Sequence, residues 1–140
     1  MDDLQEMLQF RYVLESGMLR NSYNRLTKQQ LSELKKLNQH CVRKTQEPWE
    51  HWSYNAEFHI RLLSFAGNTY AVDTLARCMD RLKRGYAQLS YKKWVSEPVI
   101  DTRNHELLLT HLENRDIDGA VACLLEDLND FADAGFHIIP

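Results

Sequence analysis

Residues that interrupt helices are scarce in this 140-residue chain, which has five glycines and three prolines. Between them, apolar residues recur at every third or fourth position, which is the period of amphipathic helices and not the alternation of strands. We therefore expect an all-α fold, an antiparallel bundle of about six helices joined by short connections. A chain of this length has the size of one domain with a single core, covering residues 1–140.

The sequence also has no apolar run near the roughly 18 residues that suggest a membrane span. Hydrophobic residues make up 44% and charged residues 26% of the chain, a composition that excludes a disordered tail. The first ten residues, MDDLQEMLQF, are acidic and lack the basic start and apolar centre of a secretory signal. We therefore expect a cytoplasmic protein that has no membrane partner.

Two further scarcities limit the possible functions. The three cysteines, Cys41, Cys78 and Cys123, are odd in number and far apart, so they suggest reduced core thiols, not a disulfide framework or a zinc knuckle. The net charge is −3, and the basic residues do not gather into a long patch interleaved with aromatic residues. This chain alone is therefore not expected to bind nucleic acid.

Turn and capping residues divide the chain into helices. Thr27 and Gln30 have the spacing of a capping box at a helix start, and Gly67 supplies a left-handed stop. We expect helices over about Asp3–Asn21, Thr27–Thr45 and Pro48–Gly67, and a fourth that begins after Asn68 and ends near Tyr91. After a break at Ser96–Pro98 a fifth helix carries His105, and after a turn at Asn114–Asp116 a sixth follows, which weakens near Gly135. The inner face of the second is expected to hold Leu31, Leu34, Leu37 and Cys41.

Four polar residues fall on the apolar stripes of three of these helices. Asn55 and His59 are four positions apart on the third, His105 lies on the fifth, and Asp127 lies on the sixth. Burying unpaired polar groups costs a few kcal/mol each, so groups aimed at one core should pair or share a ligand. Their mixed nitrogen and oxygen set suits a divalent metal such as zinc, nickel, manganese or iron(II), with positions left open for another ligand.

Two other interpretations fit the same pattern. A pair formed by His59 and Asp127 without an ion would satisfy both residues, and the chain would then be a metal-free helical interaction or dimerisation bundle. A mononuclear metal hydrolase is the third possibility, but it needs a general base near the ion, and Glu57 lies about 200° around the helix from Asn55. We therefore expect no enzymatic activity.

Arg11 lies on the inner stripe of the first helix, between Leu8 and Leu14. A guanidinium beside a core cavity can hold a carboxylate through two hydrogen bonds, so Arg11 is a candidate for binding a small carboxylate effector. Glu15, four residues later, is its alternative partner.

Five short motifs follow one another along the chain. They are R-Y-V-L-E at Arg11–Glu15, N-A-E-F-H at Asn55–His59, A-G-N at Ala66–Asn68, N-H-E-L-L-L-T-H-L at Asn104–Leu112 and R-D-I-D-G-A at Arg115–Ala120. This ordered set, which covers nearly the whole chain, resembles the FCD domain, the ligand-sensing half of the FadR subfamily of GntR bacterial transcription regulators.

The resemblance implies a helical bundle in which an Asp or Asn and three His bind one divalent metal, and a carboxylate effector coordinates that metal. Asn55 stands at the Asp/Asn position, and His59 and His105 stand at the first two His positions. Asp127 occupies the third His position, which adds negative charge beside the incoming carboxylate and leaves the metal and the effector class open. Some members of the wider group use no metal.

The resemblance also implies partners. Such regulators carry a winged helix-turn-helix domain before the FCD domain, and this chain lacks it. We expect DNA binding only through that missing domain, with the chain as a fragment of a longer regulator and a stand-alone sensor as the alternative. The family further implies a homodimer in which an effector-induced shift of the bundle changes the DNA-binding heads.

Overall fold

The computed structural model describes residues 2–41, 48–89 and 103–131, and these residues form helices without any strand. The α-helices are α1 (Asp2–Ser22), α2 (Lys28–Cys41), α3 (Pro48–Ser64), α4 (Thr69–Leu89), α6 (Arg103–Glu113) and α7 (Ile117–Phe131), and a 3₁₀ turn, η1 (Tyr23–Arg25), follows α1. The prediction of an all-α fold is confirmed.

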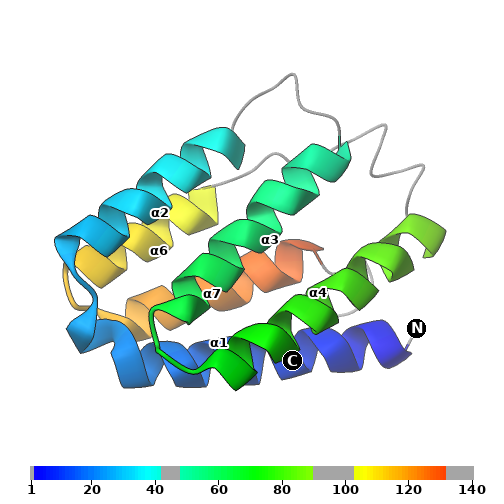
Figure 1. The fold of residues 1–140 in the computed structure, drawn as a ribbon, viewed down its shortest axis with the longest axis horizontal. Coiled ribbons are helices and arrows are strands. Elements are labelled where there is room, and N and C mark those ends of the chain that lie inside the picture. Colours follow the sequence, from blue (N-terminus) through cyan, green and yellow to red (C-terminus); the bar gives the residue numbers. More distant parts are fainter. Residues whose placement is uncertain (1, 42–47, 90–102, 132–140) are drawn as a thin grey trace.

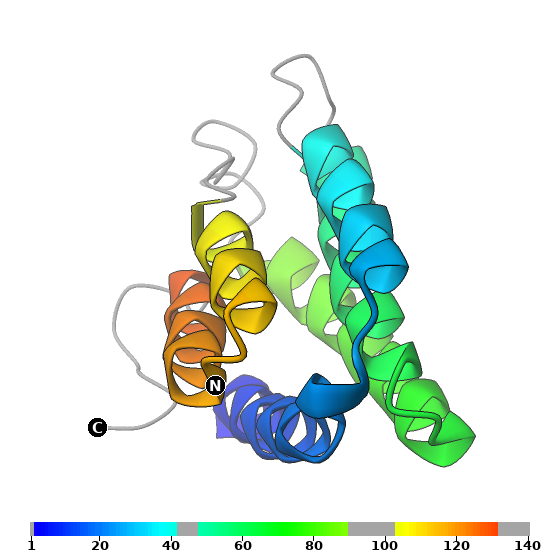
Figure 2. The ribbon, with the colours of Figure 1, turned by 90° about the vertical axis from the view of Figure 1, so that its left-hand side faces the viewer.

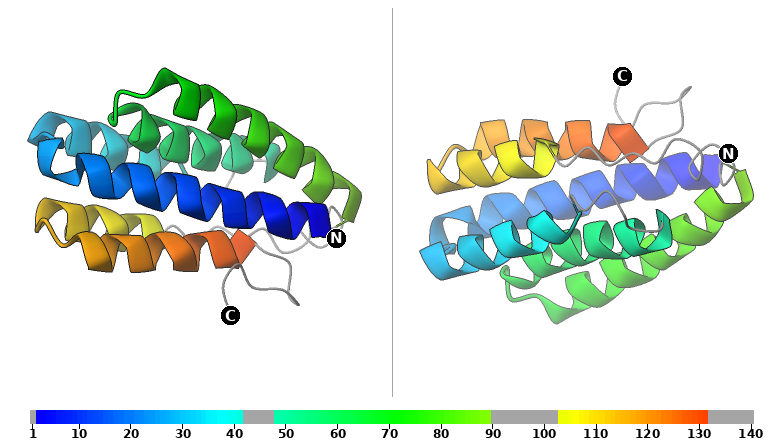
Figure 3. Two further views of the ribbon diagram at one scale, coloured as in Figure 1. Left: turned by 90° about the horizontal axis from the view of Figure 1, so that it is seen from below. Right: turned by 90° about the horizontal axis from the view of Figure 1, so that it is seen from above.

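Successive described helices run in opposite directions along the bundle (Figure 1), and their contacts close into a ring. Helix α1 packs against α7 and α4, α7 against α6, α6 against α2, α2 against α3, and α3 against α4. Figure 2 looks along the bundle and shows this ring, and the view from below in Figure 3 shows α1 lying between α4 and α7. Side chains that point inward from different helices therefore meet along one central axis.

The signals at the helix ends behave as the sequence predicted. Thr27 and Gln30 form the reciprocal capping box, with the Thr27 backbone N donating to Gln30 Oε1 at 3.0 Å and the Gln30 N to Thr27 Oγ1 at 3.1 Å. Gly67 has a φ of 77° just after α3, a left-handed conformation that costs glycine little. The expected ends near Thr45, Tyr91 and Gly135 and the break at 96–98 lie outside the described residues.

The core is built mainly from leucine. Each of the six α-helices in the described residues contributes at least one side chain with no exposed surface, and each such burial stabilises the fold by about 1.5–3 kcal/mol. These side chains include Leu8, Leu34, Phe58, Leu75, Leu82, Leu108, Leu112, Leu124 and Leu128. Cys78 is buried as a free thiol, and Cys123 is half-buried.

An arginine joins the α6–α7 turn to the α1–α2 connection. Arg115 has a left-handed φ of 57°, and its guanidinium donates to the backbone carbonyls of Tyr23 and Leu26. The Tyr23 carbonyl also accepts from the backbone N of Leu26, so the guanidinium adds a charge-assisted bond to a carbonyl that η1 already uses. The contact therefore fixes the register of α7 relative to α1.

Within the described segments, every helix is too short or too polar to cross a bilayer.

Candidate metal centre

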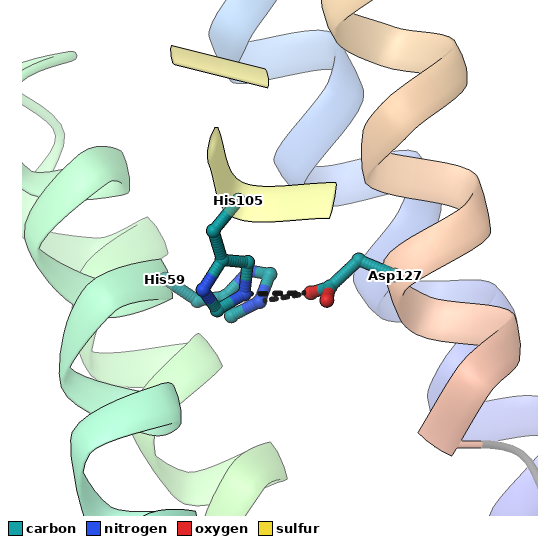
Figure 4. Close-up of side chains that lie close together, drawn as sticks. All are labelled: His59, His105 and Asp127. Carbon is teal, nitrogen blue, oxygen red and sulfur yellow. Dashed lines mark hydrogen bonds and ion pairs between the residues drawn. The ribbon is translucent and has the colours of Figure 1, made fainter. Parts of the chain in front are cut away.

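Three of the four polar residues predicted to line a metal site meet on the bundle axis (Figure 4). His59 Nε2 lies 2.7 Å from Asp127 Oδ2, and His105 Nε2 lies 3.0 Å from the same oxygen. One ligand atom from each residue lies within 4.8 Å of the others, and all three side chains are buried. Two imidazole nitrogens and one carboxylate oxygen therefore surround a single point inside the core.

The far sides of the two imidazoles are held by residues that the sequence did not identify as part of this site. His59 Nδ1 lies 2.6 Å from Glu15 Oε1 on α1, and His105 Nδ1 lies 3.0 Å from Asn38 Oδ1 on α2. Both partners are acceptors, so both Nδ1 atoms donate, and each Nε2 faces Asp127. Such support of the ring nitrogen opposite the ligand atom is typical of metal-binding histidines.

Five helices therefore supply one continuous polar network. It runs from α1 through α3, α7 and α6 to α2, in the order Arg11, Glu15, His59, Asp127, His105 and Asn38. The ring of Phe58 stacks on His105 with centroids 4.1 Å apart and an interplanar angle of 6°. The network is thus enclosed by apolar packing and shielded from water, which strengthens its electrostatic interactions.

Asn55, the fourth predicted ligand, is 2% exposed and lies one turn before His59 on the same face of α3. Its Nδ2 has no hydrogen-bond partner among the described residues. Burying an amide N–H donor without a partner costs about 1–3 kcal/mol, so Nδ2 keeps unused donor capacity beside His59.

Arg11, the predicted effector residue, is 1% exposed, and its Nε donates to Glu15 Oε2 at 3.0 Å. The alternative partner that the sequence offered is thus engaged in this structure. The Nη2 atom of the same guanidinium is buried without a hydrogen-bond partner among the described residues. Arg11 therefore keeps donor capacity for a further acceptor.

The network strongly perturbs its ionisable groups. Burial alone would favour neutral His59, but the Glu15 carboxylate and the hydrogen bond to Asp127 outweigh it and raise the pKa of His59 to about 9. Burial likewise opposes ionisation of Asp127, yet the neighbouring His105 and His59 lower the pKa of this carboxyl below its usual range. Glu15 is buried too, and Arg11 and His59 lower its pKa.

A small hollow adjoins the network on the side of Glu15 and His59. Its volume of about 10 Å³ is roughly the space of one water molecule. Apart from Glu15, His59 and Ser22, its described lining is aliphatic, formed by Met18, Leu19, Leu62, Leu63, Ala66 and Leu124.

The stability of the metal-free chain should fall as the solution becomes alkaline. The folded-state pKa of His59, about 9, lies above its ordinary value of 6.5, so its ion pairs stabilise the fold fully below pH 6.5. That contribution is lost as the pH rises through 9 and amounts to at most about 3 kcal/mol. Denaturant unfolding in EDTA at pH 6, 7.5 and 9 measures it, and a flat profile, or an equal slope in His59→Leu, would contradict this assignment.

Comparisons with known proteins agree with this architecture. The FCD domain family matches residues 6–130 of the chain. The fold is similar to a crystal structure of a transcriptional regulator, a GntR family member from Pseudomonas syringae pv. tomato str. DC3000, with a TM-score of 0.76 and 20% sequence identity. The similarity covers 91% of this chain and 53% of that chain, so this chain spans about half the length of that regulator. A search of curated proteins finds no match.

At 20% identity the structural likeness concerns the fold alone. The family match is independent of it and extends from α1 into α7, across every helix that supplies a residue to the polar network. The chain therefore belongs to the FCD domain family.

Proposed function

We propose that this chain is the effector-binding domain of a GntR-family transcription regulator and that it holds a divalent metal with His59, His105, Asp127 and Asn55. The observation that carries the proposal is the orientation of the two imidazoles. Both turn Nε2 toward one carboxylate oxygen, and both have Nδ1 bound to an acceptor.

This orientation needs positive charge at its centre. A neutral imidazole with its proton on Nδ1 presents a lone pair at Nε2, and a lone pair facing a carboxylate oxygen is repelled. Two protons would relieve the repulsion, and so would one divalent cation shared by both nitrogens and the oxygen. The donor set suits zinc, nickel, manganese or iron(II), and the amide of Asn55 offers a further oxygen one turn away.

When bound, the ion supplies a positively charged centre for the carboxylate of a small acid. Arg11, whose buried Nη2 has no hydrogen-bond partner within residues 2–41, 48–89 and 103–131, supplies a second partner for that carboxylate. Because five helices contribute to the network, a ligand there can bias their relative positions. In the full-length regulator this bias would reach DNA through an N-terminal winged helix-turn-helix domain.

The charges near the site favour binding over catalysis. Hydrolysis at the ion would require a free general base. The Glu57 carboxylate is half exposed and pairs with Arg61, while Glu15 has one oxygen on His59 and the other on Arg11. A non-enzymatic sensor therefore agrees better with these contacts than a hydrolase does.

Metal content tests the site. Elemental analysis of the purified chain should find one divalent ion per chain, and His105→Ala should remove it because one of the three converging ligand atoms is lost. His111→Ala is the matched control, since His111 lies on the same helix but pairs with Asp116 at the surface. A folded chain without stoichiometric metal, with stability unaffected by EDTA, would favour the metal-free bundle instead.

Small carboxylic acids should raise the melting temperature of the metal-loaded chain, because a ligand that binds only the folded form stabilises it. Chelation should abolish the shift. Arg11→Lys should weaken acid binding about tenfold while leaving the metal content unchanged, because lysine keeps the charge but loses the forked donor geometry. Equal affinity in this variant would remove Arg11 from the effector site.

We also propose that two copies of the chain pair through α1 and α4. Val13 on α1 is 68% exposed and Tyr70 on α4 is 77% exposed, which leaves apolar surface on both helices. Between these helices lies a hollow of about 610 Å³, whose described lining includes Phe10, Met7 and Cys78. Acidic Asp3 and Glu6 line its α1 side, and basic Arg77 and Arg81 line its α4 side.

This charge pattern suits a twofold interface. Symmetry can place α1 of one copy against α4 of the other, so that acidic residues face basic ones twice. Sedimentation should show a dimer, and Val13→Glu should weaken it at least about tenfold by burying an unpaired charge. Leu107→Glu on α6, where Leu107 is 44% exposed, is the control and should leave the dimer intact. An unchanged dimer in the Val13 variant would place the interface elsewhere.

A further inference from the structure

We infer that the effector of this domain is a short aliphatic acid with a single carboxylate. The inference rests on the proposed function and specifies which acids the same site accepts. It comes from the balance of buried charges and from the side chains that surround the hollow.

The net charge of the buried groups, counted with a bound divalent ion, allows the site to neutralise one further negative charge. The charged side chains buried in the described core, apart from any charge on the imidazoles, are those of Arg11, Glu15 and Asp127. Glu15 already pairs with Arg11, so with neutral imidazoles a divalent ion would be balanced only in part by Asp127, and the group as a whole would carry one net positive charge. A single carboxylate neutralises it, whereas a second one would be buried without a counter-charge, which is unfavourable.

Asp127 has the largest influence on how many carboxylates the site can neutralise. Its carboxylate lies at the point where both Nε2 atoms converge, so its charge acts directly on an anion bound there. A histidine in its place would donate a nitrogen without a negative charge and would leave a net charge able to balance two carboxylates. The aspartate thus shifts selectivity toward acids of lower charge.

The lining of the hollow favours an aliphatic chain. Beyond Glu15 and His59, the polar group among its described lining is Ser22, whose hydroxyl already donates to the Met18 carbonyl. A second carboxylate or several hydroxyls would therefore lack partners there. The volume of about 10 Å³ admits a few atoms only after neighbouring side chains move. Met18, which is flexible and half-buried, can adapt in this way.

Butyrate and succinate provide a matched test, because both have four carbons and they differ by one carboxylate. Calorimetric titration of the zinc-loaded chain should show butyrate binding at least about tenfold more tightly than succinate, since the second charge is uncompensated. Zinc content is measured before and after each titration. Tighter binding of succinate to a zinc-loaded chain would overturn the inference while leaving the proposed metal centre in place.

The outcomes separate the two proposals. A chain that holds no zinc would refute the metal centre and this inference together. A zinc-loaded chain that binds neither acid would refute the inference and the carboxylate effector, but not the metal site.

Two substitutions test the charge argument from different helices. Asp127→Asn and Glu15→Gln each remove one buried negative charge and keep the shape of the side chain. Either one should raise the affinity for succinate relative to butyrate about tenfold, so failure of one variant to fold leaves the other informative. Asp118→Asn makes the same charge change at an exposed position of α7 and should leave the ratio unchanged. A ratio unaffected by either buried substitution in a folded, zinc-loaded chain would also overturn the inference.

Discussion

The arrangement of this bundle depends on one oxygen atom, Oδ2 of Asp127, which both His59 and His105 approach within hydrogen-bond distance. Through it, α3, α6 and α7 are fixed relative to one another in the centre of the core. Glu15 and Asn38 then hold the far nitrogens of the rings, which ties α1 and α2 to the same point. The apolar packing alone would permit small rotations of each helix, whereas these directional contacts favour one arrangement.

Burying such a polar network costs free energy of folding. Each buried charge must recover its lost hydration from its partners, and a well-packed apolar core is often as stable as a buried ion pair. Nδ2 of Asn55 and Nη2 of Arg11 have no hydrogen-bond partner in the part of the chain that the structure describes, so that part does not satisfy every donor in this core. Buried donors without partners, next to side chains that can ligate a metal, are expected if this interior binds an ion and a small molecule.

The sequence predicted the helices and the inward direction of the key polar residues, because both follow from local periodicity and capping. It did not predict that Glu15 and Asn38 bind the far nitrogens of the two imidazoles. A four-residue spacing in the sequence predicts Glu15 as the neighbour of Arg11, whereas the distance from Glu15 to His59, on another helix, is not visible there. On α2 the apolar pattern favoured Leu37 as the inward residue, but Asn38 is buried and Leu37 is half-buried. An apolar stripe in the sequence locates the buried face of a helix to within about one residue, so only the packing of the helices decides which of two adjacent residues is buried.

Helix α1 has a special position in this molecule, because two of its faces carry residues of the proposed sites. Its inner face carries Arg11 and Glu15, which belong to the polar network, and its outer face carries the exposed Val13. Helix α4, beside it, supplies none of the network residues but shares the outer face. If an effector at the metal centre moves Glu15, the same rigid helix carries that displacement to the surface on which a second copy would bind. Thermodynamic reciprocity then requires the effector and the second copy to change each other's affinity by the same factor. Sensing and assembly would in this way be coupled through one helix, without a separate relay across the bundle.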